Sequence, residues 1–313
     1  MSLQMISLRK LARRAIQGSN DETDVIYRLL YEMVHDLDGS LDFAVRQTER
    51  AFSTQWSNLP SGQALLSDTW FRDNVDMILS REEIQVAPEW FKGKWILDAG
   101  CGNGRWAYGF AKLGANIVAV DVNESAVHAA KEALRKFEVE KHFRVSRLED
   151  LGRDLPRREY DLVFCWGVLH HCGNFSKALS SLTELVGRQG MLYLYLYGRK
   201  SLNYEQDMLL FKKRILFNTL PDDDSRYEFL LREAHNNVSK VHNLHDLYAP
   251  LINRRFQFDY IRELLKTKGF GDVTRTIEDT ELFVRAIKSG SEEFYRIWAL
   301  PKKGPPYWFH RYR

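Results

Sequence analysis

The chain has 313 residues, of which 44% are hydrophobic and 28% charged, and its formal net charge is +3. This composition excludes a disordered or fibrous protein, and a charge so near balance does not by itself indicate a nucleic-acid partner. No apolar run approaches the ~20 residues that span a bilayer, so we expect no stable membrane insertion. The absence of a signal-peptide pattern and three cysteines beside predicted strand ends favour a cytoplasmic protein with buried thiols.

Residues 1–93 are expected to form an N-terminal helical cap and a connector. Apolar residues recur at helical spacing in residues 3–11, 25–37 and 41–52. The first of these stretches is basic, and we interpret it as the solvated face of a capping helix; contact with an anionic membrane or a partner is the alternative. The polar connector that follows contains one further predicted helix, over residues 70–80.

The most informative stretch runs from residue 95 to residue 121. It predicts a buried strand over residues 95–97, a glycine-rich turn, a helix over 105–112 and a second buried strand over 117–120 that ends on Asp121. Glycines allow positive φ and close approach of the backbone to a ligand, and the turn delivers that ligand to a helix N-terminus. An acid at the tip of the next strand is placed to accept hydrogen bonds from both hydroxyls of a ribose. The unit is therefore predicted to bind an adenosine-type cofactor.

The spacing of the glycines separates two classes of cofactor. A dinucleotide fingerprint starting at Gly100 would need glycines at 100, 102 and 105, but position 105 is Arg105. The glycines present are Gly100, Gly102 and Gly104, and Asp98 precedes them. An acid here would repel a pyrophosphate but suits the ammonium of a methionine moiety. These residues resemble motif I of the class I S-adenosylmethionine (SAM) dependent methyltransferases, which implies SAM as cofactor and S-adenosyl-L-homocysteine (SAH) as product.

The resemblance implies further cofactor contacts. The strand that ends at Cys165 and Trp166 looks like motif IV of the family, where a backbone carbonyl faces the SAM ammonium. By the same resemblance Leu148 packs on the adenine ring and Glu149 or Asp150 accepts from its amine; a solvated acidic turn is the alternative. The full set of expected cofactor contacts is Trp56, Asp98, Gly100, Cys101, Gly102, Gly104, Asp121, Val122, Leu148, Glu149, Cys165 and Trp166.

Two outer elements resemble a group of bacterial methyltransferases. One is the Phe-x-x-Gln-Trp pattern of residues 52–56, where an N-terminal helix of that group closes over SAM; Gln55 or Trp56 would then touch the cofactor. A tryptophan that only packs in the core is the alternative. The other element is residues 242–256, which says little about the acceptor. Members of this group are often found making surface polysaccharides or secondary metabolites.

Strand and helix alternate over residues 94–198, as in a parallel doubly wound sheet. The resemblance implies an α/β fold with a seven-stranded, mostly parallel sheet of order 3-2-1-4-5-7-6, whose last two strands form an antiparallel hairpin. We expect a SAM-binding core over 94–198, a helical acceptor-binding insertion over 199–255, the end of the core sheet over 256–288 and a basic, aromatic tail over 289–313. An insertion of this length in a compact domain is usually functional, so we expect the acceptor to be read there.

The candidates for a catalytic role are His170, His171 and His245. A histidine titrates near working pH, so one of them would take the proton of an acceptor hydroxyl or amine. Alternatively, the adjacent pair only fixes the turn into the next helix. The candidates for lining the acceptor pocket are His245, Asp246, Tyr248 and Arg254. We interpret the acidic run at 222–224 as a helix cap and expect no metal site.

We therefore predict a SAM-dependent methyltransferase acting on oxygen or nitrogen of a small molecule or a glycan or secondary-metabolite precursor. Two alternatives stay open. One is an RNA methyltransferase, since aromatic and basic residues of the tail would stack on bases and neutralise phosphates. The other is a SAM-binding regulator or non-catalytic partner subunit. The tail would otherwise pack on the body or on a second subunit, which leaves a homo-oligomer open.

Overall fold

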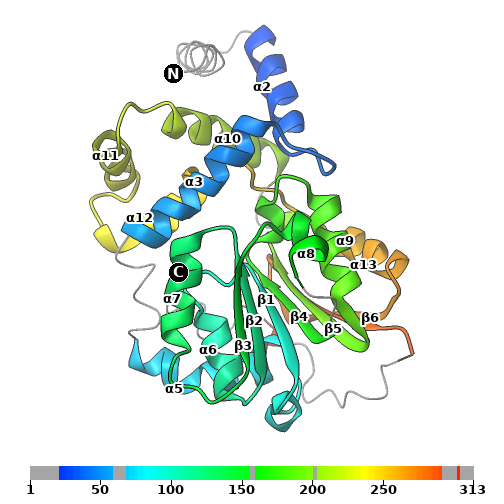
Figure 1. Ribbon diagram of the computed structural model, residues 1–313. Helices are drawn as coiled ribbons and strands as arrows, with labels where there is room; N and C mark the ends of the chain where they lie inside the picture. The colour runs from blue at the N-terminus through cyan, green and yellow to red at the C-terminus, as the bar shows by residue number, and fades with distance from the viewer. Residues whose placement is uncertain (1–20, 59–67, 156–158, 200–202, 291–301, 304–313) are drawn as a thin grey trace.

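The computed structural model describes residues 21–58, 68–155, 159–199, 203–290 and 302–303. In this part of the chain one sheet has the order β3-β2-β1-β4-β5-β7-β6-β8 (Figure 1). Its strands are β1 (Trp95–Ala99), β2 (Asn116–Asp121), β3 (Lys141–Val145), β4 (Tyr160–Trp166), β5 (Val186–Leu196), β6 (Phe270–Glu278), β7 (Leu282–Lys288) and β8 (Lys302–Lys303).

The expected strand order is confirmed for the first seven strands. The pairs β3-β2, β2-β1, β1-β4 and β4-β5 are parallel, whereas β7 is antiparallel to both β5 and β6. The two-residue strand β8 was not expected: it pairs in parallel with the end of β6, so a short piece of the predicted tail joins the sheet.

Alternate residues of the strands pack against two different layers of helices, because successive side chains of a strand point to opposite faces. In β1, Ile96 belongs to one buried cluster and Leu97 to the other. The first layer contains α5 (Thr69–Met77), the π-helix η1 (Ile78–Glu83), η2 (Pro88–Phe91), α6 (Arg105–Lys112) and α7 (Glu124–Ala133). The second contains α8 (Leu151–Asp154), α9 (Phe175–Leu185) and α13 (Phe258–Thr267). Coverage on both faces explains the continuous hydrophobic strands.

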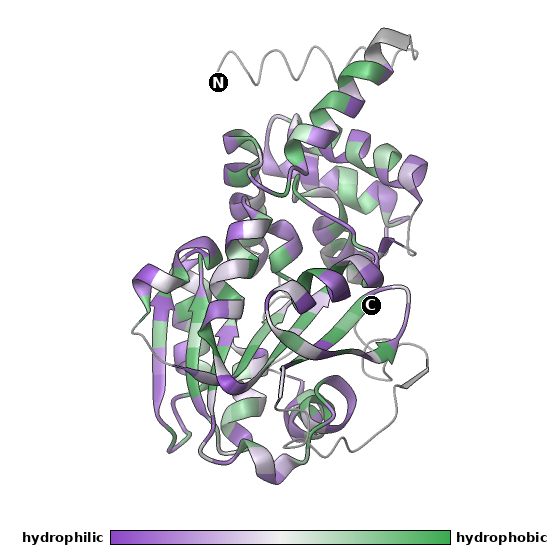
Figure 2. Cartoon of the chain, turned by 90° about the vertical axis from the view of Figure 1, so that its right-hand side faces the viewer, coloured by the Kyte–Doolittle hydropathy of each residue, from purple (hydrophilic) through white to green (hydrophobic). Residues whose placement is uncertain are grey.

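The N-terminal cap and the insertion pack together as one helical layer beyond the carboxyl ends of the strands (Figure 1). Its helices are α2 (Asp21–Val34), α3 (Asp42–Asn58), α10 (Tyr204–Asn218), α11 (Asp223–Glu233), η6 (Val238–Lys240) and α12 (Val241–Tyr248). Phe211 of α10 packs with Tyr31 of α2, and Phe217 of α10 packs with Ala51 of α3. Figure 2 shows hydrophobic residues along the central strands, whereas these upper helices mix hydrophobic and hydrophilic residues.

Local capping explains where two of these helices begin. The Asn203 side chain accepts a hydrogen bond from the backbone N–H of Gln206, and the Gln206 side chain accepts one in return from the Asn203 N–H. At α11 the Asp222 carboxylate accepts from the Ser225 N–H, which confirms the predicted helix cap.

Two sequence predictions lie outside the described residues: the basic helix over residues 3–11 and the aromatic part of the tail over 304–313. Within the described ranges, none of the helices combines the length and the apolar content needed to cross a bilayer. The division into a cap, a core, an insertion and a tail stays a prediction.

Candidate functional site

A cleft with about 540 Å³ of space, part of it open to solvent, lies between α3 and the loops that follow the first strands of the sheet. Six of the residues singled out in the sequence line it. These are Gly100, Asp121, Val122, Leu148, Glu149 and His171. They come from the ends of β1 and β2, from η3 (Leu148–Asp150) after β3, and from η4 (Leu169–His171) after β4. The cleft is therefore located at the carboxyl edge of the sheet, where ligands of open α/β folds bind.

Helix α3 supplies the opposite wall of the cleft. Val45, Thr48, Glu49 and Phe52 line it, and their spacing of three and four residues places them on one face of the helix. The sequence analysis found only the Phe52 pattern; the i, i+3, i+4, i+7 spacing was the signal for the others. Trp56 lies one turn further along α3, but its side chain is outside the described residues, so its cofactor contact stays a prediction.

The glycine turn allows the backbone to come close to the cleft. Gly100, Gly102 and Gly104 have φ of 85°, 52° and 84°, in the left-handed region that favours glycine. A Cβ at Gly100 would lie 2.2 Å from Cγ2 of Val168, which itself lines the cleft. A Cβ at Gly104 would lie 2.7 Å from the Ala130 Cα. Glycine is therefore required here both by conformation and by space.

The Asp121 carboxylate organises the turn from the tip of β2. Its Oδ2 accepts from the Gly102 N–H at 2.9 Å, and its Oδ1 accepts from the Asn123 N–H at 2.9 Å. Burial raises the pKa of Asp121, and these backbone donors oppose that rise. A carboxylate has lone pairs for about four hydrogen bonds, so both oxygens keep capacity for ribose hydroxyls.

Asp98 lies behind the turn, outside the lining of the cleft. Its side chain is 1% exposed, and burial raises its pKa to about 7, while a hydrogen bond from the Ala107 N–H acts in the opposite direction. The other carboxylate oxygen, Oδ2, has no hydrogen-bond partner among the described residues. A buried acceptor without a donor beside a ligand-binding turn fits a cationic group such as an ammonium.

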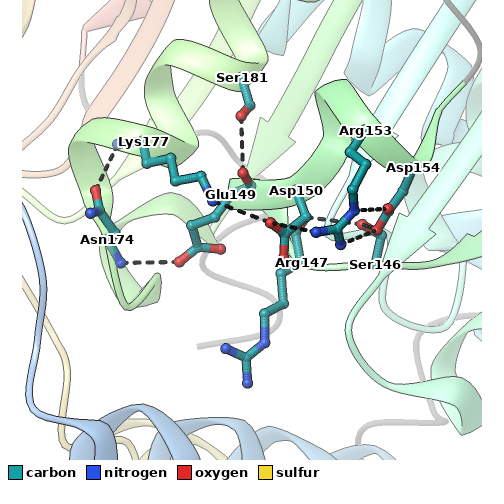
Figure 3. A network of polar contacts seen from close by, with 9 residues as sticks. All are labelled: Ser146, Arg147, Glu149, Asp150, Arg153, Asp154, Asn174, Lys177 and Ser181. Atoms are coloured by element: carbon teal, nitrogen blue, oxygen red, sulfur yellow. Dashed lines mark hydrogen bonds and ion pairs between the residues drawn. The ribbon is translucent and has the colours of Figure 1, made fainter.

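Polar contacts fix the loop after β3 (Figure 3). The Glu149 Oε1 accepts from the backbone N–H of Asn174 at 3.0 Å. Asp150 instead pairs with Lys177, whose Nζ lies 3.2 Å from Oδ1. Glu149 lines the cleft next to Leu148, so of the two acids it is the better placed for a ligand there.

An ion pair bridges the two walls of the cleft. Arg147 extends away from this network towards α3 (Figure 3), and its Nη2 lies 2.9 Å from the carboxylate of Glu49. Both residues line the cleft, and both side chains are partly exposed. Burial raises the pKa of Glu49, while Arg147 acts against that rise. The pair therefore connects α3 with the core directly across the site.

His171 is the catalytic candidate that reaches the cleft. Its Nδ1 lies 2.7 Å from the carbonyl oxygen of Ile252, and because a carbonyl can only accept, Nδ1 carries the proton. The Phe52 ring lies 4.8 Å from the imidazole, between ring centroids. Burial lowers the pKa of His171 to about 3, so at neutral pH it is an uncharged imidazole and a weak base.

The other two histidines lie deeper. His170 is 0% exposed, neither ring nitrogen has a hydrogen-bond partner in the described structure, and its ring centroid is 4.1 Å from that of Tyr197. His245 of α12 is buried against the Phe217 ring, at 6.2 Å between centroids, and is not part of the cleft lining. The adjacent residues His170 and His171 therefore occupy distinct environments. The catalytic role of each histidine stays a prediction.

The remaining predicted cofactor residues surround the cleft without lining it. Cys101 and Cys165 are buried free thiols. The Trp166 ring stacks on Tyr195, with 4.2 Å between centroids, and the Arg105 guanidinium lies 4.5 Å above the Trp166 ring. Contact of these residues with the cofactor stays a prediction.

Two of the predicted acceptor-pocket residues make internal contacts instead. The Tyr248 hydroxyl donates to Glu233 at 2.7 Å. The buried Arg254 guanidinium connects the cap to the core by hydrogen bonds. It donates to the carbonyls of His35, Asp36, Cys172 and Gly173 and to the Ser40 hydroxyl. In the described part of the chain, no group of three or more His, Cys, Asp or Glu side chains is arranged to hold a metal ion.

Comparison with known proteins identifies the central part of the chain. Residues 97–192 match the family model for a methyltransferase domain. Over 112 residues the chain is 32% identical to a ubiquinone biosynthesis O-methyltransferase of Dechloromonas aromatica (strain RCB), covering 36% of this chain and 48% of the relative. A protein of the same name from Coxiella burnetii (strain RSA 331 / Henzerling II) is 27% identical over 143 residues, or 46% of this chain and 59% of the relative. The chain thus spans about half the length of the curated relatives it matches.

Among solved structures, the chain is similar to magnesium protoporphyrin IX methyltransferase from Synechocystis PCC 6803 with bound SAH. The TM-score is 0.43 and the identity 18%, over 84% of this chain and 93% of the other. The plantazolicin methyltransferase in complex with SAH gives a TM-score of 0.41 and 17% identity, over 71% of this chain and 74% of the other. These likenesses say nothing about the substrate of this chain.

Proposed function

We propose that this chain, whose residues 97–192 are a domain of the class I SAM-dependent methyltransferase superfamily, transfers a methyl group from SAM to an oxygen of a small molecule. The observation that carries the proposal is the cleft, which brings the glycine turn at Gly100, the acid Asp121 and the loop at Leu148 together. The names of the two relatives described above, both O-methyltransferases, support oxygen as the acceptor atom.

Two lining residues of the cleft and one residue behind the glycine turn fit SAM. Asp121 would accept from the ribose hydroxyls while still bonded to the turn. Leu148, buried at the adenine end, would pack on the ring, with Glu149 beside it. The unpartnered oxygen of Asp98 would accept from the ammonium. Apolar and charged residues thus divide the cleft as the parts of SAM would require.

When bound, SAM would supply an electrophilic methyl carbon: the acceptor oxygen would bond to it as the carbon–sulfur bond breaks, the donor would leave as a neutral thioether, and a hydroxyl acceptor would lose its proton to solvent at the open part of the cleft. Positioning and exclusion of water account for much of the rate of such an in-line displacement. Helix α3 forms one wall of the cleft and would shield bound SAM from solvent on that side. With Nδ1 bonded to Ile252, His171 has only Nε2 as an acceptor, so it would orient an acceptor hydroxyl rather than deprotonate it.

Incubation with methyl-labelled SAM and a total cell extract, followed by separation of small molecules, RNA and protein, tests the proposal. We expect label in a compound of low molecular mass, and much less with Asp121→Asn, which keeps the size of the side chain but weakens ribose binding. The matched control is Asp259→Asn, at an exposed position of α13. Label in RNA or protein, or no transfer to any fraction, would overturn the proposed function.

A further inference from the structure

A cluster of charged side chains lies beyond the cleft, where the end of β5 meets α10. Arg199, Arg214 and Arg255 surround Asp207, with nitrogen–oxygen distances of 3.2, 3.7 and 3.8 Å. Arg255 also lies 3.8 Å from Glu281. We call these five residues the arginine cluster. They come from four separate parts of the chain, which the fold brings together.

Four of the five side chains of the arginine cluster are deeply buried, whereas that of Arg199 is 32% exposed. The side chains of Asp207 and Arg214 are 0% exposed, and those of Arg255 and Glu281 are about as buried at 5% and 6%. Among the deeply buried members, two guanidinium groups face two carboxylates, and the partly exposed Arg199 adds a third positive charge. Burying an ion pair costs free energy unless its remaining hydrogen-bonding atoms are also satisfied, so the guanidinium of Arg214 needs hydrogen-bond acceptors as well as a counter-ion.

Hydrogen bonding in the same region is incomplete. The Arg214 Nε donates to the Leu247 carbonyl at 2.9 Å, but neither Nη1 nor Nη2 donates a hydrogen bond within the described structure. The amide oxygen and nitrogen of Asn253 and both ring nitrogens of His170 also lack hydrogen-bond partners there. Arg214, Asn253 and His170 are each 0% exposed. Buried polar atoms are normally satisfied in folded proteins, so a concentration of unsatisfied donors indicates a binding site.

A continuous set of rings connects the arginine cluster with the cleft. His171 lines the cleft, and its ring centroid lies 4.1 Å from that of His170 and 5.6 Å from that of Tyr197. Tyr197 also contacts the arginine cluster, because the Arg255 Cζ lies 5.2 Å from its ring centroid. Only one layer of aromatic side chains therefore separates the proposed methyl-donor site from the guanidinium groups.

We propose that the methyl acceptor carries an anionic group, a carboxylate or a phosphate, which is bound by the terminal nitrogens of Arg214 together with Arg255. This inference rests on the proposed function, because it assigns a chemical class to the acceptor. A planar guanidinium presents paired donors that match both oxyanions, and the anion would supply the acceptors that Nη1 and Nη2 of Arg214 lack. Asn253 and His170 supply further hydrogen-bonding atoms in the same region.

The test uses the full chain saturated with SAH and three probes: benzoate, phenyl phosphate and the neutral isostere benzamide. Calorimetry should show about tenfold or tighter binding of at least one anion relative to benzamide, since charge-assisted hydrogen bonds contribute about 1.5–3 kcal/mol. The stronger of the two anions identifies the carboxylate or the phosphate as the natural group. Equal binding of benzamide and both anions, or no binding of either anion, would overturn the inference.

Variants test whether the arginine cluster causes the tighter binding of anions. Arg214→Gln should lose the preference for the anion, Arg214→Lys should retain part of it, and Arg135→Gln, an exposed control, should change nothing. Each variant is first titrated with SAH. If Arg214→Gln fails to fold, the preference for an anion over benzamide is measured in Arg255→Lys and in the wild type. A preference in the wild type that Arg255→Lys weakens supports the inference, and no preference in the wild type overturns it. SAH binding without anion preference would refute the inference alone, whereas absence of SAH binding in the wild type would refute the proposed function.

Discussion

The cleft and the arginine cluster use different parts of the protein to bind. Around the cleft, backbone geometry dominates: glycines with positive φ, N–H groups held by Asp121, and loops at the ends of parallel strands. In the arginine cluster, long side chains from distant segments converge while their backbones stay in helices and loops. A shared cofactor can be bound by a fixed backbone, whereas side chains can be exchanged to suit a particular acceptor.

The largest expected effect concerns the glycine turn, where binding depends on backbone geometry. Gly100→Ala places a Cβ 2.2 Å from Val168 in a residue with φ of 85°. We expect a loss of about 3 kcal/mol in unfolding free energy and loss of detectable SAH binding. Denaturant unfolding measures the change in unfolding free energy, and calorimetry measures SAH binding.

Gly93→Ala is the matched control, because its φ is 74° and nothing lies within 4 Å of the added Cβ. It should cost only about 1 kcal/mol and leave SAH binding intact. Val168→Ala in the Gly100→Ala background should restore part of the stability. Equal effects of the two glycine substitutions would show that the contact with Val168 has no importance.

The two buried arginines Arg254 and Arg214 give the next comparison. Arg254 donates to five oxygens, so Arg254→Gln leaves several buried acceptors without donors and should lower the unfolding free energy by about 3 kcal/mol. Arg214→Gln removes one of the three guanidinium groups around Asp207 and one hydrogen bond to the Leu247 carbonyl, so it should lower the unfolding free energy by less, about 1–2 kcal/mol. Urea unfolding of both variants measures this, and equal destabilisation would mean that Arg214 has a structural role.

The pH dependence of stability tests the environment of His171 between the two regions. Its folded pKa of about 3 lies below the unfolded value near 6.5, so between these pH values the unfolded chain binds the proton that the folded chain rejects. The unfolding free energy should therefore fall as pH is lowered, by about 2 kcal/mol from this group at pH 5.

Unfolding curves at pH 7.5 and pH 5 should show a smaller decrease for His171→Gln, which can still donate to the Ile252 carbonyl. His128→Gln, at an exposed position of α7, serves as the control and should behave as the wild type. If His171→Gln retains the full pH dependence, the imidazole is not the group that resists protonation.

The smallest expected effect concerns the Arg147–Glu49 pair across the cleft. Since partly exposed ion pairs contribute up to about 1 kcal/mol, Glu49→Gln should accelerate SAH release by no more than about fivefold, and added salt should reduce the difference. Stopped-flow release from Glu49→Gln, Arg147→Gln and the double variant gives the coupling. Additive effects of the two single substitutions would exclude the pair as a link between α3 and the core.

The difference between the cleft and the arginine cluster also explains what could be predicted from the sequence. The glycine turn, α6 and Asp121 are close in the chain, so their spacing predicted an adenosine-type cofactor, and the resemblance to the methyltransferases implied SAM and the strand order. The wall formed by α3 was found only in part, because its contacts depend on how the helix is oriented on the core. The arginine cluster was not foreseen. Arg199, Asp207 and Glu281 have no local pattern, and only the packing of α10 against the sheet end brings them together.

The most direct test of the account is calorimetric titration of SAH into the wild type, Asp121→Asn and Asp259→Asn. We predict saturable one-site binding for the wild type and the Asp259→Asn control, and at least about tenfold weaker binding for Asp121→Asn, as expected for loss of charge-assisted hydrogen bonds to a ribose. No saturable heat in the wild type, or equal affinity in Asp121→Asn, would contradict the assignment of the cleft as the SAM site.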